Sequence, residues 1–440
     1  MQETVKPIAY LVTAAHQLKA RRTLAYLFAL TLCGRARETL TESAVRPLSQ
    51  HFFLWHKCCV EDLCRKSLPP NLLENKMQKL RREFFSTSAA AGVAGAALGF
   101  PMIAKAQQSF NWKMTSFYPK GSPFYFDGPG SATDLAKRIR EMSNGRLQIQ
   151  VFGAGELIPA AEGFDAVRAG TVEMNHANSY FWTGKTFAAQ YFTAVPFGLN
   201  FQGTNGWLYD GGGIDLWHEV YDPFGMVAFP CGNTGVQMTG WFRKEIKTVA
   251  DLKGLRMRIP GLAGKVYSSL GVDVRAVPPG EIFPALERGV IDAAEFVGPF
   301  QDRRMGLHKA AKFYYTTGWH ENATVSELLI NKAAWNKLPK DLQSIVTNAA
   351  AACNVISEAW CQRNNAEAMD DLIKNHKVIA KPLPDSVIKA LRAETKKVLA
   401  EAVAKDPMTK KVHDSYMEFK SKYDSWVAYS EIPYYTKVRG

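Results

Sequence analysis

An arginine at the end of an apolar strand pattern is the residue best suited to hold an anion. Arg258 lies in the run Met257-Arg258-Ile259-Pro260. A buried arginine is costly without a negative partner, and its planar guanidinium matches a carboxylate in a two-point grip. The partner is therefore either a bound carboxylate or an internal aspartate or glutamate. Arg256, two residues earlier, projects from the same strand face.

Two glutamates could bind a metal ion or transfer protons. Glu295 directly follows the short strand predicted at Val290–Ala294, where an acid is unusual. Glu321 lies further along, after Gly318. Beside an arginine, the pair could act as general acid and base on a bound oxo acid. The simpler alternatives are a salt bridge for Glu295 and a solvated loop position for Glu321.

Other marks of an enzyme are missing from the sequence. It contains no G-x-S-x-G elbow, no H-E-x-x-H helix and no phosphate-binding loop with its lysine. His308 and His320 are isolated along the chain. We therefore expect a binding protein and keep an exported enzyme acting on an oxo acid as the alternative.

Two segments of the chain resemble each other and indicate how these residues are positioned. Phe164–Glu173 and Phe283–Asp292 each read as an amphipathic helix, a terminating glycine and a short strand. The first strand leads into Asn175–Tyr180 and the second into Glu295–Pro299. Ligands of open α/β sheets bind outside the carboxyl ends of the strands. The pattern favours two lobes facing a cleft, although chance similarity of common units remains the alternative.

The rest of the sequence after residue 106 alternates strand-like and helix-like segments, which predicts an α/β architecture. Residues 332–404 are mainly helical, and Leu342–Asn365 forms one long helix candidate without Pro or Gly. The aromatic end Phe419–Gly440 either contacts another protein or packs on its own core. The other predicted elements are strands at Asn111–Ser116 and Leu147–Phe152 and a helix at Ser131–Met142, whose Leu135, Ile139 and Met142 share one face.

Composition excludes several classes of protein. The 440 residues are 47% hydrophobic and carry a net charge of +13. Residues 1–106 hold 15 Lys and Arg against 7 Asp and Glu, leaving 39 against 34 in the rest, so the bulk is only mildly basic. No downstream basic run with interleaved aromatics exists, which argues against nucleic-acid binding. The seven cysteines form no C-x-x-C array, so we expect Cys353 and Cys361 to be small buried residues.

Residues 77–106 have the features of an export signal. Arg81 and Arg82 precede Phe84 and Phe85, and an Ala/Gly-rich apolar stretch ends at Ala104-Lys105-Ala106. The adjacent arginines resemble a twin-arginine (Tat) signal, which exports folded proteins. The signal begins after residue 76, so residues 1–76 are interpreted as an over-long gene model or an unstructured extension. We expect a periplasmic mature protein from about residue 107.

From about Phe110 to Tyr429 the sequence resembles the extracytoplasmic solute-binding subunits of TRAP transporters, the DctP-like family. The branch that binds 2-oxo acids is the nearest match. The resemblance covers nearly the whole mature chain, keeps the family order and lies in five runs: Gly232–Gln237, Gly240–Arg243, Asp251–Gly261, Gly289–Pro299 and Gly318–Glu321.

The resemblance implies a type II periplasmic-binding-protein fold. Two α/β lobes enclose a ligand cleft, crossing strands form the hinge, and long C-terminal helices brace the back. The first lobe is expected at about residues 107–235 with part of 330–440, and the second at about 236–329. The bound ligand is expected to be a small carboxylate of the pyruvate or lactate kind.

The family also implies roles for individual residues. Arg258 clamps the ligand carboxylate, and the Asn178-Ser179-Tyr180 loop contributes contacts from the opposite lobe, although generic turn residues are the alternative there. A sodium or calcium ion is held by Gln237, Glu295, the carbonyl of Phe296 and Glu321, an all-oxygen set that suits a hard cation. Phe296 departs from the branch, which usually has tryptophan, so indole hydrogen bonding is lost there.

Partners follow from the same resemblance. The ligand passes to a two-part membrane permease, and no catalytic cofactor is expected. Some members of the branch form homodimers through swapped C-terminal helices, which the aromatic tail of this chain makes plausible.

Overall fold

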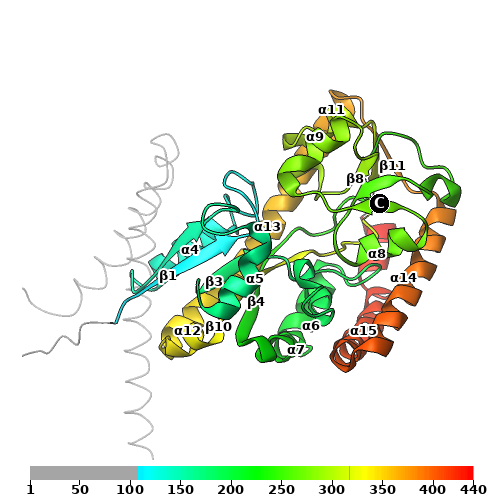
Figure 1. Ribbon diagram of the computed structural model, residues 1–440. Coiled ribbons are helices and arrows are strands. Elements are labelled where there is room, and N and C mark those ends of the chain that lie inside the picture. The colour runs from blue at the N-terminus through cyan, green and yellow to red at the C-terminus, as the bar shows by residue number, and fades with distance from the viewer. Residues whose placement is uncertain (1–107, 317, 440) are drawn as a thin grey trace, which may run out of the picture. The chain divides into compact units, whose positions relative to one another are not determined.

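The computed structural model describes residues 108–316 and 318–439. The predicted signal at residues 77–106 and the segment before it lie outside the described residues. The described chain forms two β-sheets with helices packed around them (Figure 1). It is therefore an α/β protein, as its alternating sequence pattern predicts.

The first sheet has five strands in the order β2-β1-β3-β10-β4. Strand β1 runs parallel to β2 and β3, whereas β10 is antiparallel to both of its neighbours. Side chains are buried along the whole of β3 and β4, which places these strands inside the lobe. The strands are β1 (Phe110–Ser116), β2 (Leu147–Phe152), β3 (Met174–Ala177), β4 (Met226–Asn233) and β10 (Val325–Asn331).

The second sheet has six short strands in the order β11-β9-β5-β8-β6-β7. Strands β6, β7 and β8 are parallel, and β5 is antiparallel to β8 and β9. Its last strand comes from far along the chain, after the longest helix. The strands are β5 (Gly240–Phe242), β6 (Arg256–Arg258), β7 (Asp273–Arg275), β8 (Ala293–Ala294), β9 (Phe313–Thr316) and β11 (Ile379–Pro382).

The first helix of the described chain follows its sequence signals. Helix α4 begins after Ser131, whose side chain accepts a hydrogen bond from the backbone of Asp134 and caps the helix. Leu135 and Ile139 are buried as expected, but Met142 is 51% exposed. Met142 is exposed because it is the last residue of the helix.

The helices cover both sheets and connect them. In chain order they are α4 (Ala132–Met142), α5 (Gly163–Ala169), α6 (Phe201–Tyr209), α7 (Gly213–Tyr221), α8 (Gly261–Ser269), α9 (Ile282–Glu287), α10 (Pro299–Arg304), α11 (Leu307–Ala310), α12 (Lys332–Lys337), α13 (Lys340–Lys374), α14 (Asp385–Lys405), α15 (Pro407–Val427) and α16 (Glu431–Pro433). Short helical turns include η2 (Ser179–Trp182) and η3 (Ala188–Phe192). None of the described helices is both long and apolar enough to span a membrane.

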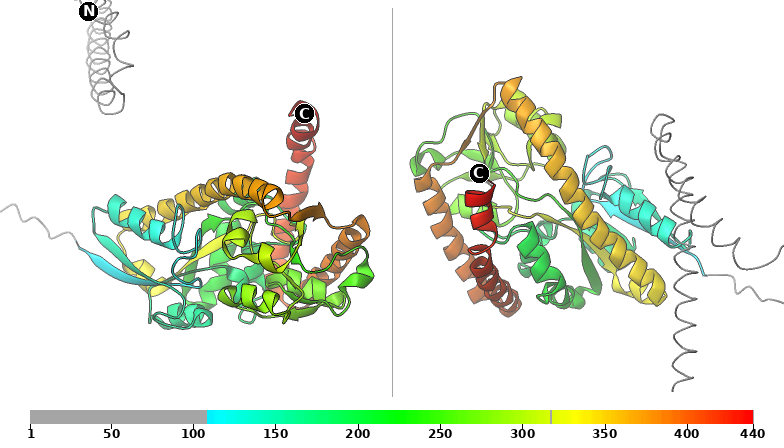
Figure 2. Two further views of the ribbon diagram at one scale, coloured as in Figure 1. Left: turned by 90° about the horizontal axis from the view of Figure 1, so that it is seen from above. Right: turned by 180° about the vertical axis from the view of Figure 1, so that it is seen from behind.

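Long helices brace both lobes. Helix α13 packs on β4 and α4 of the first lobe and on α10 of the second, and it runs across the molecule on the viewer's side in the right-hand view of Figure 2, which is seen from behind. Helix α14 packs on α8, while α15 returns to α6, α7 and η3. Cys353 and Cys361 of α13 are buried free thiols, as expected.

Two chain segments cross between the sheets side by side. Residues 234–239 lead from β4 into β5, and residues 318–324 lead from the β9 side into β10. Backbone hydrogen bonds join the two segments, from Thr234 N to Thr324 O at 3.1 Å and from Gln237 N to Glu321 O at 3.0 Å. Two paired connections between the sheets are where we expect the lobes to hinge, and they are called the hinge below.

Candidate ligand and cation site

The site begins where two neighbouring strands of the second sheet end. Strands β6 and β8 are parallel, and Arg258 is the register partner of Ala294. Glu295 follows directly and donates its backbone N–H to the carbonyl of Arg258 at 3.0 Å. Two residues predicted from separate sequence runs therefore lie beside each other because their strands pair in register.

Arg258 is buried, with its guanidinium only partly paired. The residue is 6% exposed. Its Nη1 donates to the Glu295 carbonyl at 2.6 Å and lies 3.3 Å from Glu295 Oε2, while Nε reaches the Val277 carbonyl at 3.4 Å. Among the described residues, Nη2 donates to no protein acceptor. The internal ion pair thus exists, yet one side of the guanidinium is left for another anion.

Arg256 has a different environment. It forms a two-point pair with Asp292, at 2.9 Å from Nε and 2.7 Å from Nη2. The Arg256 side chain is 40% exposed. Its charge is matched at the surface of the lobe, so it has no unpaired fork to offer a ligand.

The hinge supplies the next group of polar side chains. Gln237 donates its amide to the Thr324 hydroxyl at 2.9 Å, and that hydroxyl donates to Glu321 Oε2. Gln237 Oε1 is buried without a hydrogen-bond partner, as is Glu295 Oε1. Buried polar atoms are rarely left unpaired, so these two oxygens indicate a missing ligand.

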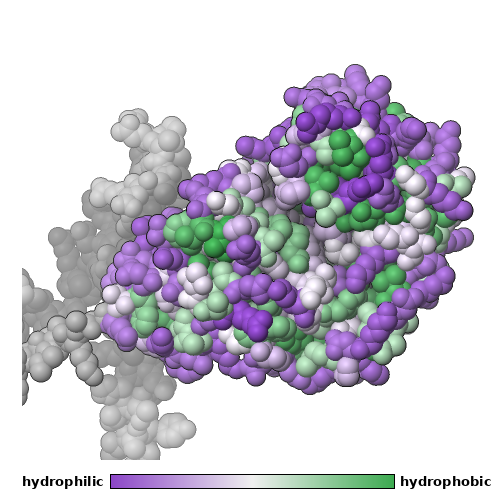
Figure 3. All heavy atoms as spheres, in the orientation of Figure 1, coloured by the Kyte–Doolittle hydropathy of each residue, from purple (hydrophilic) through white to green (hydrophobic). Residues whose placement is uncertain are grey.

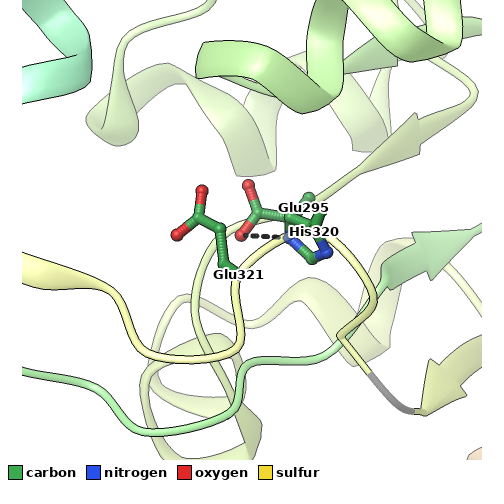
Figure 4. Close-up of side chains that lie close together, drawn as sticks. All are labelled: Glu295, His320 and Glu321. Carbon is green, nitrogen blue, oxygen red and sulfur yellow. Dashed lines mark ion pairs between the residues drawn. The ribbon is translucent and has the colours of Figure 1, made fainter. Parts of the chain in front are cut away.

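Glu295, His320 and Glu321 form a compact buried cluster. Each offers a ligand atom within 4.8 Å of the others. Figure 4 shows the Glu295 carboxylate between Glu321 and the ring of His320, and Nε2 of His320 lies 3.6 Å from Glu295 Oε1. His320 is isolated along the chain, but the fold brings it beside Glu295 at the end of β8.

Burial sets the protonation of this cluster. It raises the pKa of Glu295 to about 8, with Arg258 acting in the opposite direction, and raises that of Glu321 to about 7, with Glu295 adding to the effect. Burial lowers the pKa of His320 to about 4. The ionised forms of both carboxylates are disfavoured by burial and by their mutual repulsion. A cation bound between them would favour the ionised forms and so lower both pKa values.

The donor set fits a hard cation. Glu295 and Glu321 bring carboxylate oxygens to one place. The amide oxygen of Gln237, whose side chain is linked to Glu321 through the Thr324 hydroxyl, is buried without a hydrogen-bond partner, as is Glu295 Oε1. Calcium and sodium prefer such amide, carboxylate and carbonyl oxygens. Phe296 directly follows Glu295 in the chain, and its carbonyl is the fourth oxygen predicted for the cation. The Phe296 residue is half-buried.

The first lobe contributes tyrosines to the same region. Tyr118 and Tyr125 stack with ring centroids 3.7 Å apart. Both follow β1 in the chain. Burial raises the pKa of each hydroxyl well above its usual range, and the negative charge of Glu321 raises it further. The pKa of the Tyr180 hydroxyl is also raised well above its usual range, mainly by burial and in smaller part by the charges of Glu321 and Glu295. The strand-end rule could not have located Tyr125, because β1 ends at Ser116 and a loop separates the two.

The side chains of two further predicted residues, Asn178 and Ser179, form their hydrogen bonds within the first lobe. Asn178 accepts from the Tyr118 hydroxyl at 2.5 Å and donates to the Val325 carbonyl at 3.0 Å. The Ser179 hydroxyl donates to the Ala189 carbonyl at 2.8 Å and contacts Thr193. The structure therefore places Asn178 behind the tyrosines and does not bring the Ser179 hydroxyl to the cluster.

A cavity of about 260 Å³ with walls from both lobes adjoins the site, and of the residues described above only Tyr125 and Phe296 line it. Tyr125 and Phe296 line it from opposite sides, and Lys120 and Arg304 supply positive charge. The face of the molecule seen in Figure 3 is mostly hydrophilic, with apolar residues in separate patches. This is an arrangement that a small anion could enter.

Comparisons with known proteins give a consistent family. Residues 129–406 match the family model described as DctP, bacterial extracellular solute-binding protein, family 7. A monocarboxylate 2-oxoacid-binding periplasmic protein of Nostoc sp. is 41% identical over 359 residues, which are 80% of this chain and 97% of that protein.

Two solved structures are similar over the described chain. A TRAP periplasmic solute-binding protein from Colwellia psychrerythraea, with bound calcium and pyruvate, is 41% identical, with a TM-score of 0.72 over 74% of this chain and 99% of that one. Its counterpart from Pseudoalteromonas atlantica, with bound sodium and pyruvate, is 39% identical, with a TM-score of 0.72 over 75% and 99%.

Proposed function

The chain belongs to the DctP family of bacterial extracellular solute-binding proteins, and we propose that it captures a small 2-oxo or 2-hydroxy acid together with a cation. The family and its relatives confirm a two-lobed periplasmic-binding-protein fold and a role as the solute-binding protein of a TRAP transporter, not an enzyme. The exported-enzyme alternative is therefore set aside. TRAP solute-binding proteins are periplasmic and deliver their ligand to membrane partners.

The half-paired guanidinium of Arg258 is the observation that carries the proposed ligand class. Its free Nη2 side can bind one carboxylate oxygen, while the cation beside Glu295 and Glu321 binds the other carboxylate oxygen or the 2-oxo group. A 2-oxo acid presents these two features on adjacent carbons. Relatives with bound pyruvate and calcium or sodium support this chemistry.

Loss of Arg258 tests the carboxylate grip. Calorimetric titration of the mature protein with pyruvate in calcium should show one site per chain. Arg258→Ala should weaken binding by about 2–3 kcal/mol, or roughly 30- to 150-fold, since it removes charge-assisted hydrogen bonds. Arg256→Ala on the same strand breaks a half-exposed pair with Asp292 and should change affinity little. Equal effects of the two variants would refute the role of Arg258.

Removal of metal tests the cation. We expect pyruvate affinity to fall when calcium is chelated in a sodium-free buffer, and to return when either ion is added. Glu295→Gln should weaken the restored binding because it removes one charged ligand. Affinity that stays unchanged through chelation would contradict the cation proposal.

Export through the twin-arginine pathway is a proposal that rests on the sequence of residues 77–106. Changing Arg81 and Arg82 to lysine should leave precursor in the cytoplasm, which fractionation would detect. Mass spectrometry of the native protein tests the interpretation of residues 1–76. A peptide from that segment would overturn it.

A homodimer through the C-terminal helices is the last part of the proposal. Trp426 is 64% exposed and Tyr429 is 84% exposed, and the end of α15 projects from the helices around it in the left-hand view of Figure 2. Sedimentation velocity on the mature chain and on a chain ending at Val427 should show a dimer only for the former.

A further inference from the structure

The buried ring of His320 lies against the proposed cation site. Neither ring nitrogen makes a hydrogen bond among the described residues, although the residue is 1% exposed. We infer that His320 Nε2 is a metal ligand, so that this site also binds transition-metal ions such as Co²⁺ and Zn²⁺. The inference rests on the proposed cation site and adds to it a nitrogen donor and a class of metal.

The distances match shared coordination better than a hydrogen bond. Nε2 lies 3.6 Å from Glu295 Oε1, beyond the usual 2.7–3.2 Å of an N–H···O bond. Two ligands about 2.0–2.1 Å from one tetrahedral metal are roughly 3.4 Å apart. Glu321 completes the group, with all three ligand atoms within 4.8 Å of one another.

The two oxygens of Glu295 face different partners. Oε2 lies on the side of Arg258, at 3.3 Å from Nη1, while Oε1 faces His320 and accepts no hydrogen bond. The Arg258 charge is thus held away from the lone pair of the imidazole. A metal between Oε1 and Nε2 would satisfy both buried atoms at once.

The chemistry of the donors determines which ions respond. Carboxylate and amide oxygens suit calcium and sodium, whereas an imidazole favours cobalt, nickel, copper and zinc. A site with both kinds of donor accepts either group of ions, and the ions compete. Calcium in excess should therefore displace Co²⁺ from the protein.

The ratio of metal affinities tests the inference. After chelation, the mature protein is titrated by calorimetry with Co²⁺ and, separately, with Ca²⁺. His320→Gln replaces the imidazole by an amide and should lower the ratio of Co²⁺ to Ca²⁺ affinity at least about tenfold. An equal loss for both ions would overturn the inference, because His320 would then only position Glu295. No loss for either ion would overturn it as well.

Proton NMR of the unaltered protein gives a second readout that does not depend on a variant. One equivalent of Co²⁺ should produce a paramagnetically shifted, exchangeable imidazole N–H resonance that disappears when calcium is added. Its absence at one equivalent would refute the ligand assignment.

A matched control separates this site from surface histidines. His376→Gln removes a histidine whose side chain is 40% exposed and should leave the affinity ratio and the shifted resonance unchanged. Pyruvate titration of the same samples keeps the two proposals distinct. If pyruvate fails to bind with any metal, the proposed ligand is wrong, yet the Co²⁺ resonance still decides the role of His320.

Discussion

At the residue scale, the buried glutamates differ in whether the protein itself supplies hydrogen-bond donors to their carboxylates. Glu295 and Glu321 lie together at the hinge, where the oxygen acceptors Glu295 Oε1 and Gln237 Oε1 have no hydrogen-bond donor, which indicates an external cation. Glu327 is equally buried, but Trp182 Nε1 and the Tyr221 hydroxyl donate to its two oxygens. An acid whose hydrogen bonds close within the protein needs no ligand, so we assign Glu327 to the core of the first lobe.

Glu327 should make stability depend on pH. Burial raises its pKa to about 7 from the ordinary 4.5. Between these values the folded protein holds a proton that the unfolded chain has released, so this residue lowers stability as pH rises from 4.5 to 7. Glu327→Gln imitates the protonated acid and should remove this loss, which is on the order of 3 kcal/mol.

Urea unfolding of both proteins at pH 5 and pH 7.5 measures this difference. The variant should resemble the natural protein at pH 5 and exceed it in free energy of unfolding at pH 7.5. Parallel pH profiles would show that burial of Glu327 costs nothing.

At the scale of elements, the long helix α13 packs closely against the start of α4 in the first lobe. Gly130 precedes the cap of α4, with a φ of +76°. A Cβ there would lie 2.7 Å from the Cys353 carbonyl oxygen and from the Ser357 backbone nitrogen. The helix backbone would have to shift, because it cannot yield as a flexible side chain does.

Gly130→Ala should therefore destabilise the protein more than its backbone angle alone requires. Gly145 is the matched control, since it has the same φ of +76° and a Cβ added there would meet nothing within 4 Å. Both variants carry the cost of a left-handed alanine, and Gly130→Ala should lose about 1–3 kcal/mol more through overpacking. Chemical denaturation gives both values. Equal losses would mean that α13 accommodates the methyl group freely.

At the scale of the whole described molecule, the two lobes are in contact across the site. Tyr118 and Tyr125 of the first lobe pack in one buried cluster with Val297 of the second. Arg258 and Glu321 act electrostatically on the Tyr118 hydroxyl from the other side. Contact between the lobes is the arrangement expected when a ligand is enclosed. Among the described residues, the chain passes between the lobes only through the two hinge segments and the long helices.

Ligand should shift the molecule toward this closed arrangement. A compact domain of this size has a radius of gyration of about 20 Å. In small-angle scattering, the metal-free and ligand-free mature protein, kept monomeric by dilution, should have a larger radius that decreases on addition of pyruvate and calcium. Arg258→Ala should not contract under the same conditions. An unchanged radius in the natural sequence would contradict ligand-driven closure.

The sequence by itself predicted the α/β class, the helix capped by Ser131, the long helix, and Arg258 and Glu295 as candidate binding residues. Each of these leaves a local signature, because caps, periodicity and a charge in an apolar run depend on near neighbours. The boundaries of elements differ from those expected: the strand at Val290–Ala294 is reduced to its last two residues, and the helix at Leu342–Asn365 extends over Lys340–Lys374.

Only the tertiary structure decided which residues meet. Strand β10 joins the first sheet and β11 the second, although their positions in the chain suggest otherwise. The hinge brings His320 to Glu295, and packing turns the Ser179 hydroxyl toward Ala189. Such contacts join residues far apart in sequence through register and burial, which no local pattern records. For the same reason the unpaired oxygens that indicate a cation became visible only in the folded chain.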